Sequence, residues 1–315
     1  MTGLLDTLMD RLVLPGYTSL GYAVRRRAWA TGDPEPLALQ GKRALVTGAG
    51  SGLGKQTALD LARLGAAVHL GVRDVVKGRA AADEIVAAVP GARVEVELCD
   101  VSSLASVRAF VAELAAAHPT LDVLVHNAGV LPPRRQESAE GHEITLATHV
   151  LGPLLMTELL RPLLTAGDGR VVLVSSGGMY ARPLPADDLE YLHGDYSGTA
   201  AYARSKRVQV ELTPRMQQRW PELSVHAMHP GWAATPGIVS SLPVFARVVG
   251  PLLRDAAAGA DTAVWLAATQ PAPAGGRFWH DRAPRPTSYL ARTRPAPGDV
   301  DAVWEACLSA CGLAG

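Results

Sequence analysis

Short apolar runs alternate along the chain with segments of helical periodicity, starting near residue 43. The runs, several of which are bounded by glycine, cover residues 43–47, 67–72, 94–98, 121–127, 170–176, 223–231 and 276–281. Between them, apolar side chains recur at helical spacing over residues 55–65, 103–114, 141–165 and 200–219. This alternation predicts an α/β fold, a doubly wound parallel sheet with helices on both faces. Ligands of such sheets bind beyond the carboxyl ends of the strands.

The same pattern divides the chain into an N-terminal helical extension (1–40), one α/β domain (41–285) and a C-terminal helical tail (286–315). In the extension, leucines recur at helical spacing and form an apolar stripe, at Leu4, Leu5, Leu8 and Leu12. The stripe must be buried somewhere. Three hosts stay open: the body of the protein, a second subunit, or a membrane surface aided by the basic cluster 25–27.

Composition excludes several classes of function. With 48% hydrophobic and 19% charged residues, the chain can bury a large core. The formal net charge is zero, so nucleic acid is not an expected partner. The three cysteines, Cys99, Cys307 and Cys311, form neither a CxxC pair nor a zinc pattern. We therefore expect reduced, buried thiols, a cytoplasmic location and no metal site. No apolar run is long enough to span a bilayer.

The first predicted strand runs into the sequence TGAGSGLGK, where Gly48, Gly52 and Gly54 fall at a strand-to-helix turn. Glycines there let the backbone approach a pyrophosphate, and the start of the helix offers free N–H groups. Farther along, the chain contains 30 Lys and Arg residues, of which four are lysine, and one of these is Lys206, four places after Tyr202. Residues four apart share a helix face, so this ammonium is expected to lower the pKa of the phenol. Tyr202 could then exchange a proton with a carbonyl or alcohol oxygen.

Taken together, TGAGSGLG, HNAG (126–129), VVLVSS ending at Ser176, YARSK (202–206) and HPGWAAT (229–235) resemble the classical short-chain dehydrogenase/reductases. The resemblance covers about residues 41–285 and implies a Rossmann fold with NAD(P)-dependent oxidoreductase activity. It also implies catalytic roles for Ser176, Tyr202 and Lys206, with Ser175 as an alternative to Ser176 by spacing alone. The cofactor-binding positions that it implies are Thr47, Gly48, Ser51, Gly52, Leu53, Gly54, Arg73, Asp100, Val101, Asn127, Ala128, Gly129, Tyr202, Lys206, Pro230, Gly231 and Thr235.

One position departs from the family pattern. Where the family usually has an asparagine that anchors a water of the proton relay, this chain has His149. Two interpretations stay open. In one, the helix is merely irregular there and the backbone still holds the water. In the other, the imidazole itself joins the catalytic relay, because histidine titrates near neutral pH.

The end of the second predicted strand bears on the choice of cofactor. NAD-preferring members tend to carry Asp where this chain has Val72, and Arg73 follows, which suits a 2′-phosphate. We therefore expect NADP(H). NAD(H) stays open because Asp74 would accept hydrogen bonds from a ribose if the register differed by two residues.

Apolar residues in the segments after the strand ends predict a bulky apolar substrate with a carbonyl or alcohol group. The expected walls are Leu131, Pro132, Met179, Tyr180, Trp232, Ile238, Leu242 and Phe245. A dinucleotide-binding sensor without turnover, on the same fold, is the alternative, but it would not need Ser176, Tyr202 and Lys206. The sequence leaves open the substrate's identity, the direction of the reaction and the oligomeric state.

Overall fold

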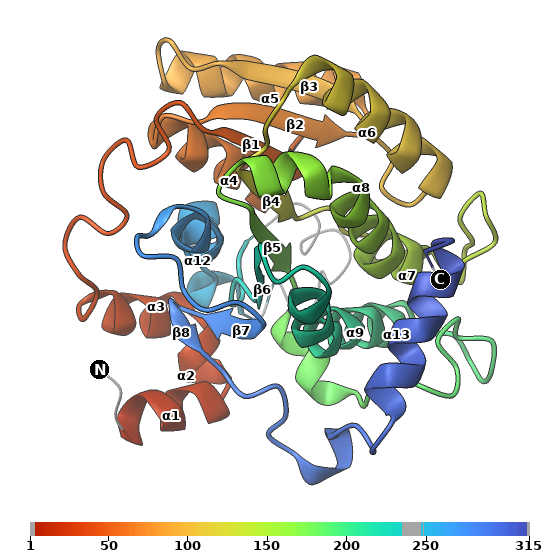
Figure 1. Cartoon of the computed structure of the whole chain (residues 1–315). Helices are drawn as coiled ribbons and strands as arrows, with labels where there is room; N and C mark the ends of the chain where they lie inside the picture. Colours follow the sequence, from red (N-terminus) through yellow and green to blue (C-terminus); the bar gives the residue numbers. More distant parts are fainter. Residues whose placement is uncertain (1–3, 235–246, 248, 314–315) are drawn as a thin grey trace.

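The computed structural model describes residues 4–234, 247 and 249–313, and it contains one eight-stranded sheet (Figure 1). The strand order is β3-β2-β1-β4-β5-β6-β7-β8, parallel throughout except for the antiparallel pair β7–β8. The strands are β1 (Arg43–Thr47), β2 (Ala67–Val72), β3 (Val94–Leu98), β4 (Val123–His126), β5 (Arg170–Val174), β6 (Ser224–Met228), β7 (Arg277–His280) and β8 (Ala283–Pro284). The predicted doubly wound parallel sheet is confirmed.

Helices cover both faces of the sheet, because alternate strand residues point to opposite sides. Ala44 and Val46 lie in the core on one face, whereas Leu45 and Leu124 lie in the core on the other. The first core contains residues of α4 (Gly52–Arg63), α5 (Val75–Ala88) and α12 (Ala256–Ala268). The second contains residues of α6 (Leu104–Ala117), α8 (Gly152–Ala166) and α9 (Gly198–Arg219). Both faces of the central strands are thus covered, as their near-continuous apolar sequences require, whereas the edge strand β3 is only partly buried.

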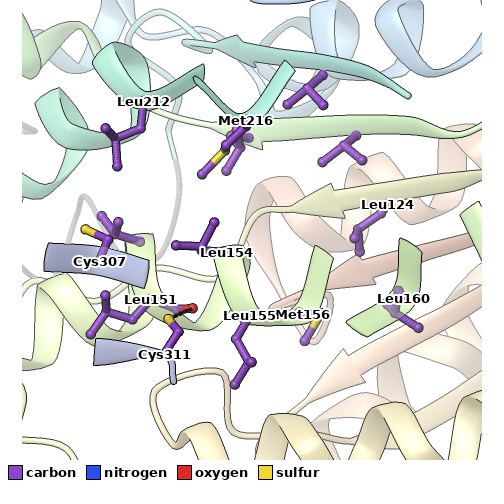
Figure 2. Close-up of a cluster of buried hydrophobic side chains, with 14 of the residues drawn as sticks. Leu124, Leu151, Leu154, Leu155, Met156, Leu160, Leu212, Met216, Cys307 and Cys311 are labelled. Carbon is purple, nitrogen blue, oxygen red and sulfur yellow. Dashed lines mark hydrogen bonds between the residues drawn. The ribbon is translucent and has the colours of Figure 1, made fainter. Parts of the chain in front are cut away.

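The C-terminal helix α13 (Asp299–Ala310) extends the second core. Figure 2 shows Cys307 and Cys311 beside Leu151 and Leu154, close to the side chains of α9. All three cysteines are free and buried, which confirms the expected unpaired thiols. Burial raises the pKa of Cys311 to about 12, so this thiol stays protonated and acts as a small apolar side chain.

The N-terminal extension begins with three short helices, α1 (Leu4–Arg11), α2 (Leu14–Tyr17) and α3 (Ser19–Arg26), and residues 27–42 follow as turns and irregular backbone. These helices lie beside β7 and β8 (Figure 1). Arg25 is only 4% exposed and pairs with Asp6 at 2.7 Å and with Asp281 at 2.8 Å. Among the described helices, none combines the length and apolarity needed to cross a bilayer.

The body of the protein does not cover the leucine stripe at Leu8 and Leu12, which are 51% and 56% exposed. Of the three hosts that the sequence left open, a second subunit and a membrane surface stay predictions. Arg25, one of the three arginines named for the membrane surface, is buried in ion pairs with the body of the protein. The helix α3 therefore docks on the body through charge pairs.

Candidate active site

The glycine turn between β1 and α4 has the backbone geometry that a phosphate cradle needs. Gly48 and Gly52 have φ values of +66° and +56°, a region that side chains strongly disfavour. A Cβ atom on Gly54 would collide with Asn127 Nδ2 and lie 2.5 Å from the Gly48 carbonyl oxygen. Ser51 is the N-cap of α4 without a side-chain hydrogen bond, so the first N–H groups of the helix stay available. The turn therefore fits a dinucleotide pyrophosphate.

Hydrogen bonds join the end of β4 to the end of β1 beside this turn. The Thr47 hydroxyl oxygen accepts hydrogen bonds from the backbone amides of Asn127 and Ala128, each at 3.1 Å. Asn127 Nδ2 donates in return to the Thr47 carbonyl at 3.0 Å. These bonds bring Thr47, Asn127 and Ala128, three of the predicted cofactor positions, to one edge of the sheet.

The predicted catalytic side chains meet at the end of β5. Tyr202 and Lys206 lie on α9, and Lys206 Nζ is 5.6 Å from the centre of the Tyr202 ring. Lys206 Nζ donates to the Val174 carbonyl at 2.8 Å. The Ser175 hydroxyl donates to the Lys206 carbonyl at 3.0 Å and is buried, so it holds α9 against β5. Ser176 is partly exposed and contacts Tyr202, the place expected of a residue that binds substrate.

Burial is the largest influence on the pKa values of Lys206 and Tyr202. It lowers the pKa of Lys206 to about 7. It also raises the pKa of Tyr202, and the Ser176 hydroxyl acts in the opposite direction. The expected lowering of the Tyr202 pKa by Lys206 is therefore not found in this geometry. Tyr202 therefore keeps its proton at neutral pH.

His149 lies in a short π-helix, η1 (Ala147–Leu151), with a fully buried ring. The Val130 amide donates to its Nε2 at 3.0 Å, so the proton of the neutral ring is on Nδ1. That Nδ1 lies 2.8 Å from the Ser205 hydroxyl, which in turn donates to the Tyr202 carbonyl at 2.9 Å. Burial, followed by the charge of Lys206, holds the pKa of His149 well below its usual value.

The helix around His149 is irregular because a proline, Pro153, follows four residues later. Pro153 lacks an N–H group, so it cannot donate to the carbonyl of His149 four residues earlier. Gln209 Nε2 from α9 donates to that carbonyl instead, at 2.6 Å. His149, the residue that departs from the family pattern, thus lies in a segment whose backbone is hydrogen-bonded to α9, the helix that carries Tyr202.

The residues expected to select the cofactor lie at the end of β2. Val72 is buried, whereas Arg73 is exposed and has no hydrogen bond or ion pair with another residue in the described part of the chain. Asp74 is the N-cap of α5 and accepts from the Lys77 amide at 3.1 Å. Asp100 accepts from the backbone and the hydroxyl of Ser102 at 3.0 and 2.7 Å, and Val101 beside it is buried.

The predicted substrate walls do not share one environment. Leu131, Tyr180 and Trp232 are partly exposed. Pro132 and Met179 are buried, and Arg207 donates to the Met179 sulfur at 3.3 Å, so Met179 packs into the protein interior. The Tyr180 hydroxyl donates to the Pro286 carbonyl at 2.7 Å, toward the C-terminal tail. Four predicted positions lie outside the described residues, namely Thr235, Ile238, Leu242 and Phe245.

Sequence reasoning missed two residues at this edge of the sheet, Tyr17 and Arg254. Arg254 Nη1 donates to the carbonyl of Pro230, at 3.3 Å, and Tyr17 accepts at its carbonyl from the Trp232 amide, at 2.8 Å. Neither residue falls in a family motif. Both are far in the chain from the loop that they contact, so no local pattern could have indicated them.

A model of the short chain dehydrogenase family matches residues 42–186. Dehydrogenase/reductase SDR family member 12 of Bos taurus is 38% identical over 293 residues, which is 92% of each protein. Retinol dehydrogenase 13 of Homo sapiens is 35% identical over 235 residues, covering 72% of this chain and 71% of that protein. A crystal structure of a Beutenbergia cavernae protein with NADP bound at low occupancy is 27% identical, with a TM-score of 0.62 over 78% of this chain and 97% of that one.

The similarity to dehydrogenase/reductase SDR family member 12 covers most of the chain, and in the structure Tyr202 and Lys206 lie together on α9. The protein is an NAD(P)-dependent enzyme and belongs to the short-chain dehydrogenase/reductase family.

Proposed function

We propose that the protein is an NADP(H)-dependent oxidoreductase that interconverts a carbonyl group and an alcohol on a bulky apolar substrate. The observation that carries the proposal is the group of Ser176, Tyr202 and Lys206 beside the glycine turn, at the carboxyl edge of the sheet. A bound dinucleotide supplies or accepts the hydride, and the chain supplies the proton.

Tyr202 is the proposed general acid/base. Its raised pKa keeps the phenol protonated, so in the reducing direction it donates to the substrate oxygen as negative charge develops there. Ser176 orients that oxygen by a hydrogen bond. Lys206 is buried beneath the Tyr202 ring and stabilises the phenolate that forms, because an ammonium favours a neighbouring anion.

His149 is proposed to position this group and not to carry protons. Its Nε2 already accepts from Val130, and its Nδ1 already bonds Ser205, so both ring nitrogens have partners. Its pKa is held well below neutrality by burial. The ring therefore connects the loop after β4 to the helix that carries Tyr202. Of the two interpretations left open by the sequence, these contacts support a structural role.

The preference for NADP(H) rests on Arg73 and Asp74. The Asp74 carboxylate is used as the N-cap of α5 and pairs with Lys77 at 3.5 Å, so it is not free to accept from a ribose. Arg73 is exposed at the same strand end and can pair with a 2′-phosphate. The bound NADP in the similar Beutenbergia cavernae structure is consistent with this proposal.

The proposal of an apolar substrate rests on partly exposed Leu131 and Trp232, in the segments that follow β4 and β6, and on the similarity to a protein named retinol dehydrogenase 13.

The buried, unpaired cysteines support a reducing compartment, and we propose the cytoplasm.

The test is dinucleotide oxidation and reduction with a panel of aldehydes, ketones and alcohols that ranges from polar sugars to long-chain and aromatic compounds. We expect NADPH-dependent turnover with a preference for the apolar members. Tight dinucleotide binding without turnover across the panel would instead indicate the sensor.

A further inference from the structure

The N-terminal extension reaches the active site at one residue. Tyr17 precedes β1 by 26 positions, yet its side chain is only 2% exposed. A Cβ atom on Gly177 would lie 2.5 Å from Tyr17 Cε2, so the tyrosine ring occupies the space beside that residue. Gly177 directly follows Ser176 and begins the 3-10 helix η2 (Gly177–Ala181). The ring therefore packs directly behind the turn that presents the catalytic serine.

The backbone of the same segment holds the loop after β6. The Tyr17 carbonyl accepts from the Trp232 amide at 2.8 Å. A Cβ atom on Gly231 would lie 2.8 Å from that carbonyl oxygen, and Gly231 has a φ of +70°. The glycine therefore allows the close approach of the two segments. Pro230 and Gly231 belong to the HPGWAAT motif, whose Thr235 the family resemblance assigns to the nicotinamide amide.

Arg254 joins these parts through a guanidinium that is almost fully buried. Its Nε donates to the Tyr17 carbonyl at 3.0 Å, its Nη2 to the Gly16 carbonyl at 3.0 Å and its Nη1 to the Pro230 carbonyl at 3.3 Å. Asp281 balances the charge, with contacts of 2.6 and 2.9 Å. Because a buried guanidinium needs both its charge and its donors satisfied, this arrangement has little freedom to shift.

The Tyr17 hydroxyl does not point at the catalytic group. It has no hydrogen-bond partner among the described residues. Burial, together with the nearby Asp10 and Tyr289, raises the pKa of Tyr17. The part of Tyr17 that meets the active site is therefore its ring and its carbonyl, not its hydroxyl.

We propose that Tyr17 is a positioning residue of the reaction: its ring fixes the Ser176–Gly177 turn and its carbonyl fixes the 230–232 loop, so that the N-terminal extension completes the nicotinamide end of the site. This inference rests on the proposed function, because it assigns a consequence for hydride transfer. Loss of a purely stabilising residue would affect the whole molecule, whereas loss of a positioning residue should affect these two loops in particular.

The experiment compares Tyr17→Ala and Tyr17→Phe with Trp29→Ala. Trp29 belongs to the same N-terminal extension, and its ring packs against Tyr22 and Arg282 and not against either loop, so its variant matches the loss of an aromatic ring from the extension. Hydrogen exchange should rise in residues 176–181 and 230–234 for Tyr17→Ala and stay near wild type for the other two. Equal exchange in these segments for Tyr17→Ala and Trp29→Ala would overturn the proposal.

Binding and turnover provide the second readout. We expect Tyr17→Ala to lower kcat by about 10- to 100-fold, as a misplaced catalytic geometry does. Affinity for adenosine 2′,5′-diphosphate, which lacks the nicotinamide half, should stay within about twofold, while affinity for NADP+ falls. Tyr17→Phe should resemble wild type. An equal loss for both ligands would mean a general structural defect and would also refute the inference. If wild-type protein binds no dinucleotide, the proposed function fails, and the exchange measurement still decides whether Tyr17 holds the two loops.

Discussion

The imidazole of His149 and the hydroxyl of Ser205 lie 2.8 Å apart, and this contact, together with the bond from Val130 to the other ring nitrogen, uses both nitrogens of a buried neutral histidine. Proton transfer through this ring would require one of the two bonds to break. The pH dependence of the enzyme should reflect this constraint.

We therefore predict that His149→Asn changes the rate but not the pH profile. Because burial holds the pKa of His149 well below its usual value, no transition of kcat near neutral pH should belong to this residue. Turnover of both proteins across this range is the measurement. Loss of a transition near pH 6–7 in His149→Asn would assign the histidine to the proton relay after all.

We predict that Tyr202→Phe lowers kcat by about 10²–10⁴-fold, the usual cost of losing a general acid. Affinity for the dinucleotide should change little, because the ring still packs in place. Tyr196→Phe is the matched control, since the Tyr196 hydroxyl donates to Glu143 at 2.9 Å, away from the catalytic group. Turnover of Tyr202→Phe within threefold of wild type would remove Tyr202 from its proposed role.

We predict that Arg73→Ala weakens NADPH binding by about 1.5–3 kcal/mol, the range for a hydrogen bond to a charged group, and leaves NADH binding almost unchanged. The control is Arg79→Ala, which removes another exposed arginine, from α5. Titration of both cofactors into the three proteins gives the comparison. An equal loss of the two cofactors in Arg73→Ala would argue against a 2′-phosphate contact.

Lys206 makes the stability of the protein depend on pH. The pKa of Lys206 is about 7 in the folded protein, against 10.5 for an unperturbed lysine. Between these two pH values Lys206 is protonated in the unfolded chain and neutral in the folded protein. Wild-type stability should therefore rise with pH in this window, relative to Lys206→Met, by up to about 1.4 kcal/mol per pH unit. The stability of Lys206→Met relative to wild type should thus be greatest at or below pH 7, and this difference in stability should shrink toward pH 10.

Chemical denaturation at pH 7, 8, 9 and 9.5 measures this difference. Lys77→Met, which removes a charge from an exposed site, is the control. A constant difference between wild type and Lys206→Met over the whole range would contradict the lowered pKa.

We predict that Arg25→Ala costs about 1.5–3 kcal/mol of unfolding free energy, the range for a hydrogen bond to a charged group, because Asp6 and Asp281 lose one of their two arginine partners and keep Arg285 and Arg254. The affected carboxylates are Asp6 and Asp281, at 2.7 and 2.8 Å from Arg25. The neighbouring Arg26 is exposed, so Arg26→Ala should stay within about 0.5 kcal/mol of wild type. Similar losses for the two variants would mean that the extension does not dock through Arg25.

The strands and the glycine turn could be predicted because their signals are local. The sequence predicted β1, β2 and β3 to the residue, from continuous apolar runs in the buried strands β1 and β2 and from alternating apolar and acidic residues in the edge strand β3. The placement of Tyr202 and Lys206 on one helix followed from their spacing. The lowered pKa expected for Tyr202 was not found, because the spacing shows the nearby ammonium but not the burial that outweighs it.

The contacts of the N-terminal extension could not be predicted from sequence. The leucine stripe suggested an apolar docking face, yet Leu8 and Leu12 are exposed and Arg25 is buried. Burial of an arginine depends on carboxylates that come together only in the fold, such as Asp281 from the far end of the chain. Periodicity carries no information about such partners.

The contact of Arg254 with the Gly16 and Tyr17 carbonyls also has a consequence for biosynthesis. A ribosome completes residue 17 long before it completes residues 254 and 281, and at about 5–20 residues per second the delay is many seconds. During this time the charges of Arg25, Asp6 and Asp10 stay hydrated, because their later partners Asp281, Arg285 and His280 have not been made. The N-terminal extension therefore docks only after residues 254 and 281 have been made, and a nascent chain cannot assemble this end of its site before then.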